Sequence, residues 1–263
     1  MGLNSLGLVG IILGVILIIC LILWVYRCSG PHLHKKLVGH RVIIKSFVIN
    51  LDDRPEKLKR ALEYLKDFPG LKRIPGVRTN KEDYPSDRLK AAHIGCSLAH
   101  LSVLEKISQF PSTGEKGEEL WYIIFEDDVV SRTSDSKKIC EYILNDAPKD
   151  AWAVNFGPCG SPRSSKNVSK TEKIFGRISN CAHSIAYTPE GAVRAINAIK
   201  NSLLTLPYDM ALTSDKTFNS RAYDTYSFLE PLYNKIPPGG ELLHNRGVFG
   251  QLRGVISPSD IQS

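Results

Sequence analysis

The chain has 263 residues, of which 43% are hydrophobic and 23% are charged. These proportions are typical of a globular protein and exclude a disordered or fibrous chain. The net charge is +7, but the basic residues are not interleaved with aromatic side chains, which excludes a nucleic-acid-binding module and nucleic acid as a partner.

The first apolar segment, residues 3–26, contains no charged residue and no histidine. At about 1.5 Å per residue it is long enough for a helix that crosses a bilayer core of roughly 30 Å. A cleaved signal peptide is the alternative, although the apolar run exceeds the usual length of about 7–15 residues and no basic residue precedes it. We therefore expect one transmembrane helix and a single-pass protein with the membrane as a partner.

A basic segment follows and contains Arg27, Lys35, Lys36 and Arg41. It would either contact anionic lipid headgroups or form a solvated stalk. Because the flank before the apolar segment carries no charged side chain, the positive-inside bias favours a cytoplasmic catalytic domain. The sequon Asn167-Val168-Ser169 would matter only in a lumen, and the side of the membrane stays open.

Strands and helices alternate along the rest of the chain. Residues 42–49 are nearly all apolar and β-branched, interrupted by Lys45 and Ser46, which predicts a buried first strand. Residues 50–55 then open a helix with Asp53 as its N-cap. Apolar runs predict further strands, and apolar residues at helical spacing predict further helices. In chain order these are a helix at 94–107, strands at 121–125, 151–156 and 181–187, and a helix after Thr188-Pro189.

This alternation predicts an α/β fold around a mainly parallel sheet flanked by helices, preceded by the transmembrane helix. The expected organisation is an anchor at 1–27, a basic stalk at 28–40, one catalytic domain at 41–235 and a C-terminal tail at 236–263. Cysteines at 96, 140, 159 and 181 are scattered without a C-x-x-C pair. We interpret them as buried free thiols rather than a zinc motif or a disulfide framework.

Three consecutive carboxylates, Glu126, Asp127 and Asp128, follow the predicted strand at 121–125 directly. Ligands of open α/β sheets lie beyond the carboxyl ends of the strands, and clustered carboxylates repel one another unless a cation lies between them. Hard oxygen ligands select Mg or Mn, which would neutralise the diphosphate of a nucleotide sugar. The alternative is an acidic turn that leaves the sheet without binding anything.

The turn after the first strand is a second candidate site. Its residues Asn50, Leu51, Asp52 and Arg54 precede a helix, and helix N-terminal amides attract phosphate or ribose oxygens. The turn would therefore bind a nucleotide, with Arg54 reaching a phosphate. Helix capping alone is the alternative.

Histidines supply weaker candidates. Cys96 and His100 lie four residues apart and would share one face of a helix, but a packed thiol and a hydrogen-bonded histidine explain the pair better than a metal does. His93 would point into a cleft. His244 follows a Pro- and Gly-rich tail and would either return to a metal as a nitrogen ligand or lie exposed at the surface.

Taken together, five ordered motifs resemble glycosyltransferase family 25, which includes lipopolysaccharide-type and collagen galactosyltransferases. The resemblance covers roughly residues 44–235, and each motif is loose alone but specific in this order. The motifs are Phe47-Val48-Ile49-Asn50-Leu51-Asp52 with Arg54-Pro55-Glu56, Ile74-Pro75-Gly76-Val77, Ile94-Gly95-Cys96-Ser97-Leu98-Ala99-His100, Ile123-Ile124-Phe125-Glu126-Asp127-Asp128-Val129, and Ala186-Tyr187 before Gly191-Ala192.

The resemblance implies a GT-A-like fold, a UDP-sugar donor, Mn or Mg, and inversion at the anomeric carbon. The acceptor would be a hydroxyl group of a glycan, lipid-linked or protein acceptor, and galactose is one candidate sugar. The first-strand turn, His93 and Asp127 would bind the donor, and Glu126, Asp128 and His244 would hold the metal. The chain departs from the family pattern at Asp53, His93 and Ala99.

An inverting transferase also needs a base that does not grip the metal. Asp209 is the candidate, since the resemblance places an acidic pair late in the domain, and Asp215 is the reserve. The alternative for Asp209 is the N-cap of a helix that begins at Met210. Two other functions stay open: an inactive glycosyltransferase-like, membrane-tethered binding protein, and a metal-dependent hydrolase that lacks a convincing ligand set.

Overall fold

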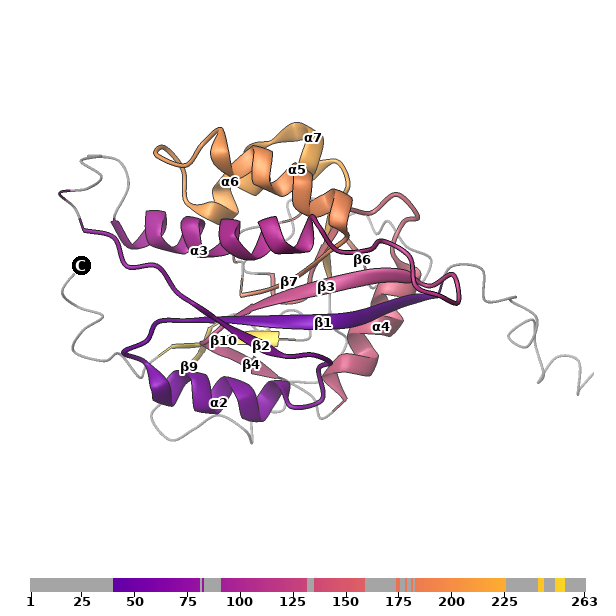
Figure 1. Ribbon diagram of the computed structural model, residues 1–263, viewed down its shortest axis with the longest axis horizontal. Coiled ribbons are helices and arrows are strands. Elements are labelled where there is room, and N and C mark those ends of the chain that lie inside the picture. Colours follow the sequence, from indigo (N-terminus) through magenta and orange to yellow (C-terminus); the bar gives the residue numbers. More distant parts are fainter. Residues whose placement is uncertain are drawn as a thin grey trace, which may run out of the picture. The chain divides into compact units, whose positions relative to one another are not determined.

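The computed structural model describes residues 40–80, 82, 91–131, 135–158, 174–175, 178, 181, 183–225, 241–243 and 249–253. Its central element is a seven-stranded sheet with the strand order β2-β1-β3-β7-β5-β8-β6 (Figure 1). The strands are β1 (Arg41–Asn50), β2 (Lys72–Pro75), β3 (Glu119–Glu126), β5 (Ala153–Asn155), β6 (Ile174–Phe175), β7 (Ser184–Tyr187) and β8 (Ala222–Thr225). Strands β7 and β6 run against the other five. The sheet is therefore mixed, with a parallel majority.

Helices cover both faces of this sheet (Figure 1). One face carries α3 (Ala91–Ile107), α5 (Pro189–Lys200), α6 (Tyr208–Ser214) and α7 (Lys216–Asn219), and the other carries α2 (Pro55–Leu65) and α4 (Ser136–Asp146). Each face has its own hydrophobic core. The result is a three-layer α/β arrangement, as the alternation of elements predicts.

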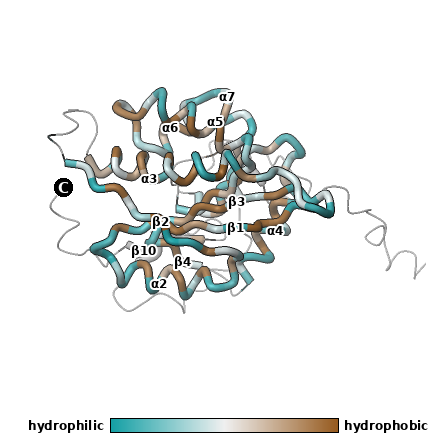
Figure 2. Tube along the Cα trace, in the orientation of Figure 1, coloured by the Kyte–Doolittle hydropathy of each residue, from teal (hydrophilic) through white to brown (hydrophobic). Residues whose placement is uncertain are grey.

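Strand β3 shows why the sequence has an unbroken apolar run at this point. Side chains alternate along a strand, so that Trp121 and Phe125 pack on the side of α2 and α4, whereas Tyr122 and Ile124 pack on the side of α3 and α5. A strand that is buried on both faces needs apolar residues at every position. Figure 2 shows the hydrophobic stretches of β1 and β3 between the two helical layers.

A second, three-stranded sheet has the order β4-β10-β9, with β4 (Val129–Ser131), β9 (Glu241–Leu243) and β10 (Phe249–Arg253). Both pairings are antiparallel. The Phe249 ring packs against Phe68 and Phe125, and its N–H donates to the carbonyl of Phe156 at 3.1 Å. Strand β4 follows the acidic triplet directly in the chain, and β10 and β9, which come from the predicted C-terminal tail, form a sheet with it.

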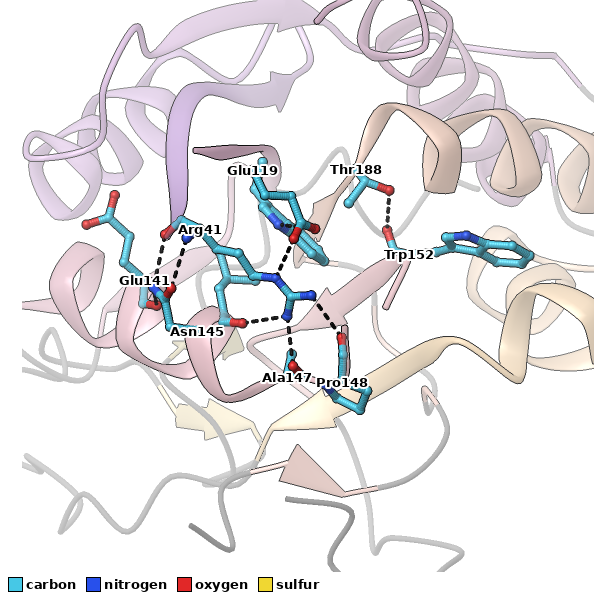
Figure 3. A network of polar contacts seen from close by, with 10 residues as sticks. Arg41, Glu119, Glu141, Asn145, Ala147, Pro148, Trp152 and Thr188 are labelled. Carbon is cyan, nitrogen blue, oxygen red and sulfur yellow. Dashed lines mark hydrogen bonds and ion pairs between the residues drawn. The ribbon is translucent and has the colours of Figure 1, made fainter. Parts of the chain in front are cut away.

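Arg41 begins β1 and is buried, although the sequence groups it with the exposed basic segment. Its guanidinium lies between Glu119 and the end of α4 (Figure 3). The Nε atom donates to Glu119 Oε2 at 2.8 Å. The remaining donors go to the carbonyl oxygens of Leu144, Ala147 and Pro148, at 2.8, 2.8 and 2.9 Å. Because the last carbonyls of a helix have no partner within it, Arg41 caps α4 and ties it to β1.

The membrane prediction is corrected by the described helices. In the ranges given above, no helix is both long enough and apolar enough to span a bilayer. The longest is α3, with 17 residues, whereas a span needs about 20 predominantly apolar ones. The expected transmembrane helix before the domain and the expected single-pass membrane localisation are therefore not supported. Residues 3–26, on which both expectations were based, lie outside the described residues.

The prediction of free thiols is correct at two positions and wrong at a third. Cys96 and Cys140 are free, whereas Cys181 is disulfide-bonded. Cys181 also has a positive φ of 80°, which few residues other than glycine adopt. Cys159 and the sequon lie outside the described residues.

Replacing Arg41 by methionine should lower the free energy of unfolding by about 3 kcal/mol or more, because three carbonyls and a carboxylate lose a charged donor in a buried place. Urea denaturation measures this loss. Lys200→Met is the matched control, since Lys200 and Glu105 form an ion pair of which each side chain is about half exposed, worth at most about 1 kcal/mol. Equal losses in the two variants would contradict the capping role.

Candidate functional site

The carboxyl ends of β1 and β3 lie side by side. The two strands pair in parallel with Ile49 opposite Glu126. Asn50 then donates from Nδ2 to Asp127 Oδ2 at 2.7 Å, and the same nitrogen donates to the carbonyl of Arg54 at 2.9 Å. The predicted nucleotide turn and the predicted acidic motif are therefore in direct contact.

An arginine that the sequence did not single out completes this turn. Arg73, on β2, donates from Nε to Asn50 Oδ1 at 3.1 Å and from Nη2 to the Asn50 carbonyl at 3.2 Å. It also forms an ion pair with Asp52. Arg73 therefore fixes the amide orientation in which Asn50 donates to Asp127. No local pattern marks it, since its role depends on β2 pairing with β1.

The predicted helix cap is different in the structure. Arg54, not Asp53, is the N-cap of α2, and it makes no side-chain capping hydrogen bond. Asp53 instead forms an ion pair with Arg78. Leu51 packs against Gly76, where a Cβ atom would lie 3.0 Å from Leu51 Cδ2. The turn is thus held by contacts with the chain after β2 rather than by capping.

Glu126 is directed towards α3. Its Oε1 lies 3.0 Å from Nε2 of His100 and 3.8 Å from Sγ of Cys96. The buried His100 ring stacks on Tyr208, with 3.9 Å between ring centroids and 16° between planes. The Tyr208 hydroxyl in turn contacts that of Tyr187. The pair at 96 and 100, which the sequence interprets as packed side chains, therefore meets the first residue of the acidic triplet.

The pKa values of Glu126 and Asp127 are shifted in opposite directions. Burial alone would raise the pKa of Glu126, but the hydrogen bond and charge of His100, with contributions from His183 and Cys96, lower it below its ordinary value. Burial raises the pKa of Asp127, although the Asn50 hydrogen bond and the charges of Lys57 and Arg54 act against this. The surroundings of Glu126 thus favour its ionised form, whereas burial of Asp127 disfavours its ionised form.

Asp128 is partly exposed, and its negative charge contributes to a raised pKa of the Cys96 thiol. Burial is the first cause that raises the pKa of the Cys96 thiol, followed by the charges of Glu126, Asp209 and Asp128. The charges of these three carboxylates therefore act on one thiol, and Glu126 is in direct contact with it. The sequence predicted Glu126 and Asp128 as metal ligands and Asp209 as the base, and the charges of all three act on Cys96.

Asp209 lies in the first turn of α6, which begins at Tyr208, and it is not an N-cap. Its Oδ2 accepts the backbone N–H of Cys181 at 2.9 Å, and its Oδ1 accepts that of Met210 at 2.8 Å. Asp215, the reserve base, is the N-cap of α7 and accepts the N–H of Phe218 at 2.8 Å. The alternative capping role thus falls to Asp215.

The histidine predictions have mixed outcomes. His93 is exposed in the first turn of α3, and His244 lies outside the described residues. The sequence missed His183, a buried residue whose carbonyl accepts the N–H of Glu126 at 3.1 Å. Gly157 makes room for its ring, because a Cβ atom there would lie 2.1 Å from His183 Nε2. His183 precedes β7 without any pattern that would mark it.

Solved structures that are similar to the chain include a glycosyltransferase involved in the glycosylation of the major capsid of PBCV-1, with 13% identity and a TM-score of 0.41 over 70% of this chain and 80% of that chain. Another is an active-site mutant of LgtC, with 12% identity and a TM-score of 0.33 over 72% and 89% of the two chains. No protein-family model matches the sequence, and no curated protein matches it. Sequence identities and TM-scores this low do not establish an activity, so the functional conclusion depends on the site itself.

The lowered pKa of Glu126 predicts a pH dependence of stability. A carboxyl whose folded pKa lies below its unfolded value stabilises the fold above the unfolded value and loses this effect as the pH falls through the folded one. Glu126→Gln should therefore be less stable than the parent near neutral pH, and this gap should close below about pH 4.5, the ordinary pKa of the group. Urea denaturation at several pH values measures the gap.

Glu105→Gln, at an exposed position of α3, is the control and should follow the parent at every pH. The difference in free energy of unfolding between Glu126→Gln and the parent could also stay constant into the acid range. That result would show that the lost contact is not ionic.

Proposed function

We propose that the chain is a glycosyltransferase, similar to family 25, that moves a sugar from a UDP-sugar to a hydroxyl group of a glycan, lipid-linked or protein acceptor, with inversion. The contact between Asn50 and Asp127 carries this proposal, because it joins the first-strand turn to the acidic triplet in one polar cluster. The ordered sequence motifs support the same assignment, and galactose is the first sugar to test.

The donor's diphosphate would bind at the start of α2. The charges of Arg54 and Lys57 act on the Asp127 carboxylate, which places both cations beside the cluster. The first amides of α2 have no partner within the helix, and the positive end of the helix dipole favours an anion there. Asn50, Leu51 and Asp52 would hold the nucleoside, and His93 stays a predicted contact of the donor.

The donor atoms at the strand end fit a hard divalent cation. Asp127 and Asp128 are partly exposed residues, and their carboxylate oxygens are ligands that suit Mn or Mg. A bound cation would neutralise the negative charge that develops on the leaving diphosphate. We propose Asp128 as the chief ligand, with Asp127 assisting and Glu126 behind them as a support. His244 stays a predicted nitrogen ligand.

The acceptor side of the reaction requires a separate carboxylate. The acceptor oxygen forms a bond to the anomeric carbon, the bond from that carbon to the diphosphate oxygen breaks, and its electron pair leaves with UDP. The acceptor proton passes to Asp209. Hydrogen bonds from the N–H groups of Cys181 and Met210 hold both oxygens of this carboxylate in one orientation, which suits a base that must be positioned beforehand.

Asp128→Asn should keep the fold, because the shape of the side chain is unchanged, and should reduce metal-dependent transfer by about 100-fold or more. Transfer and donor hydrolysis with a panel of UDP-sugars and Mn measure the effect. Asp150→Asn, an exposed carboxylate paired with Arg221, is the control and should retain full activity. Full transfer activity in Asp128→Asn would contradict the assignment of Asp128 as the chief metal ligand. Donor binding by the parent without any transfer would favour the inactive binding protein.

Asp209→Asn should reduce transfer by about 100-fold or more while UDP-sugar binding survives, since a base acts on the acceptor and not on the donor. Donor binding is measured by the rise in melting temperature with Mn present. Asp215→Asn is the matched control, because asparagine caps a helix nearly as well as aspartate. If Asp215→Asn loses transfer and Asp209→Asn does not, the assignments of the two residues must be exchanged.

A further inference from the structure

Cys96, His100 and Glu126 form a cluster that the proposed transfer reaction does not use. One ligand-type atom from each residue lies within 4.8 Å of the other two. Cys96 and His100 are one turn apart on α3 and therefore share a face of the helix. Glu126 ends β3 and approaches that face from the sheet. Two separate elements thus place a thiol, an imidazole and a carboxylate around one point.

We propose that these three side chains form a binding site for a soft divalent cation, with Zn²⁺ as the preferred ion. Sulfur and imidazole nitrogen are ligands that zinc prefers and that Mg does not. The inference does not depend on the proposed transferase activity, since Cys96 and His100 supply sulfur and nitrogen donors that the proposed Mn or Mg site at Asp127 and Asp128 does not use.

The distances suit tetrahedral zinc. With bonds of about 2.05 Å to nitrogen, 2.1 Å to oxygen and 2.3 Å to sulfur, the edges of a tetrahedron are about 3.4 Å between nitrogen and oxygen and about 3.6 Å between sulfur and oxygen. The corresponding distances here are 3.0 Å from His100 Nε2 to Glu126 Oε1 and 3.8 Å from Cys96 Sγ to the same oxygen. Along these two edges, shifts of a few tenths of an ångström would reach the tetrahedral values, and all three ligand atoms lie within 4.8 Å of one another.

Access and charge also suit a cation. Cys96 and Glu126 are partly exposed, so an ion can reach the cluster and a water molecule can fill the fourth position. His100 is buried and stacked on Tyr208, which holds its ring in one orientation. The negative charges of Asp128 and Asp209 act on the same thiol, and a divalent cation would balance them. Bound zinc would take the place of the hydrogen bond between His100 and Glu126.

The test is a titration of the full chain with Co²⁺ alone, followed by displacement with Zn²⁺. The parent should bind one equivalent with a thiolate-to-cobalt charge-transfer band in the near ultraviolet, and Zn²⁺ should abolish that band. Cys96→Ser should lose the band and weaken Zn²⁺ binding by about 100-fold or more. His100→Gln should weaken binding to a similar extent.

Two control variants separate this site from other thiols and from the acidic motif. Cys140→Ser removes the other described free thiol, which is fully buried in α4, and should keep the band. Asp128→Asn should also keep it, while it loses transfer. The absence of a thiolate band in the parent, or a band that survives in Cys96→Ser, would overturn the proposal whether or not the variants fold well.

Discussion

The parallel pairing of β1 with β3 determines where every group of the candidate site lies. With Ile49 opposite Glu126, the two strands end together and Asn50 reaches Asp127. Side chains alternate along β3, so Glu126 continues the row of Tyr122 and Ile124 and is directed towards α3. A slip of one residue would turn that carboxylate towards the aromatic cluster on the other face, among apolar rings. The hydrophobic pattern of the strand thereby fixes the orientation of the acidic residues.

A partly buried carboxylate at this position costs free energy unless it is hydrogen-bonded. His100 supplies the main compensation for this carboxylate. The His100 ring stacks on Tyr208, and the Tyr208 hydroxyl contacts the Tyr187 hydroxyl, so that these contacts restrain the position of His100. A hydrophobic residue would pack here at lower cost. The retention of a partly buried carboxylate at the edge of the core, next to other polar groups, is typical of functional sites.

The sequence predicted those features that depend on neighbouring residues. The apolar run of β3, the triplet after it and the Thr188 cap of α5 all follow local rules, and the cap is present, with Thr188 accepting the N–H of Gly191 at 3.0 Å. The sequence missed features that depend on distant pairing. Arg41 begins β1 and caps α4 instead of lying in an exposed stalk, and the His183 carbonyl meets the N–H of Glu126 only after β7 joins β3. Helix α4 itself was missed, although Ile139, Cys140, Ile143 and Leu144 show the spacing of a helix with one apolar face.

Three consecutive carboxylates need not act as one unit. Glu126 contacts a thiol and an imidazole on α3, whereas Asp127 contacts an amide on β1. The thiol and imidazole beside Glu126 are softer ligands than the amide beside Asp127. The pKa of Glu126 is lowered, whereas that of Asp127 is raised. A hard cation at Asp127 and Asp128 and a soft one at Glu126 would therefore compete little for ligands, although a charge at either place would strengthen the acidity of the other group. Because β3 ends at Glu126 and the chain turns at Asp127 and Asp128, a short acidic motif can supply two sites with different chemistry.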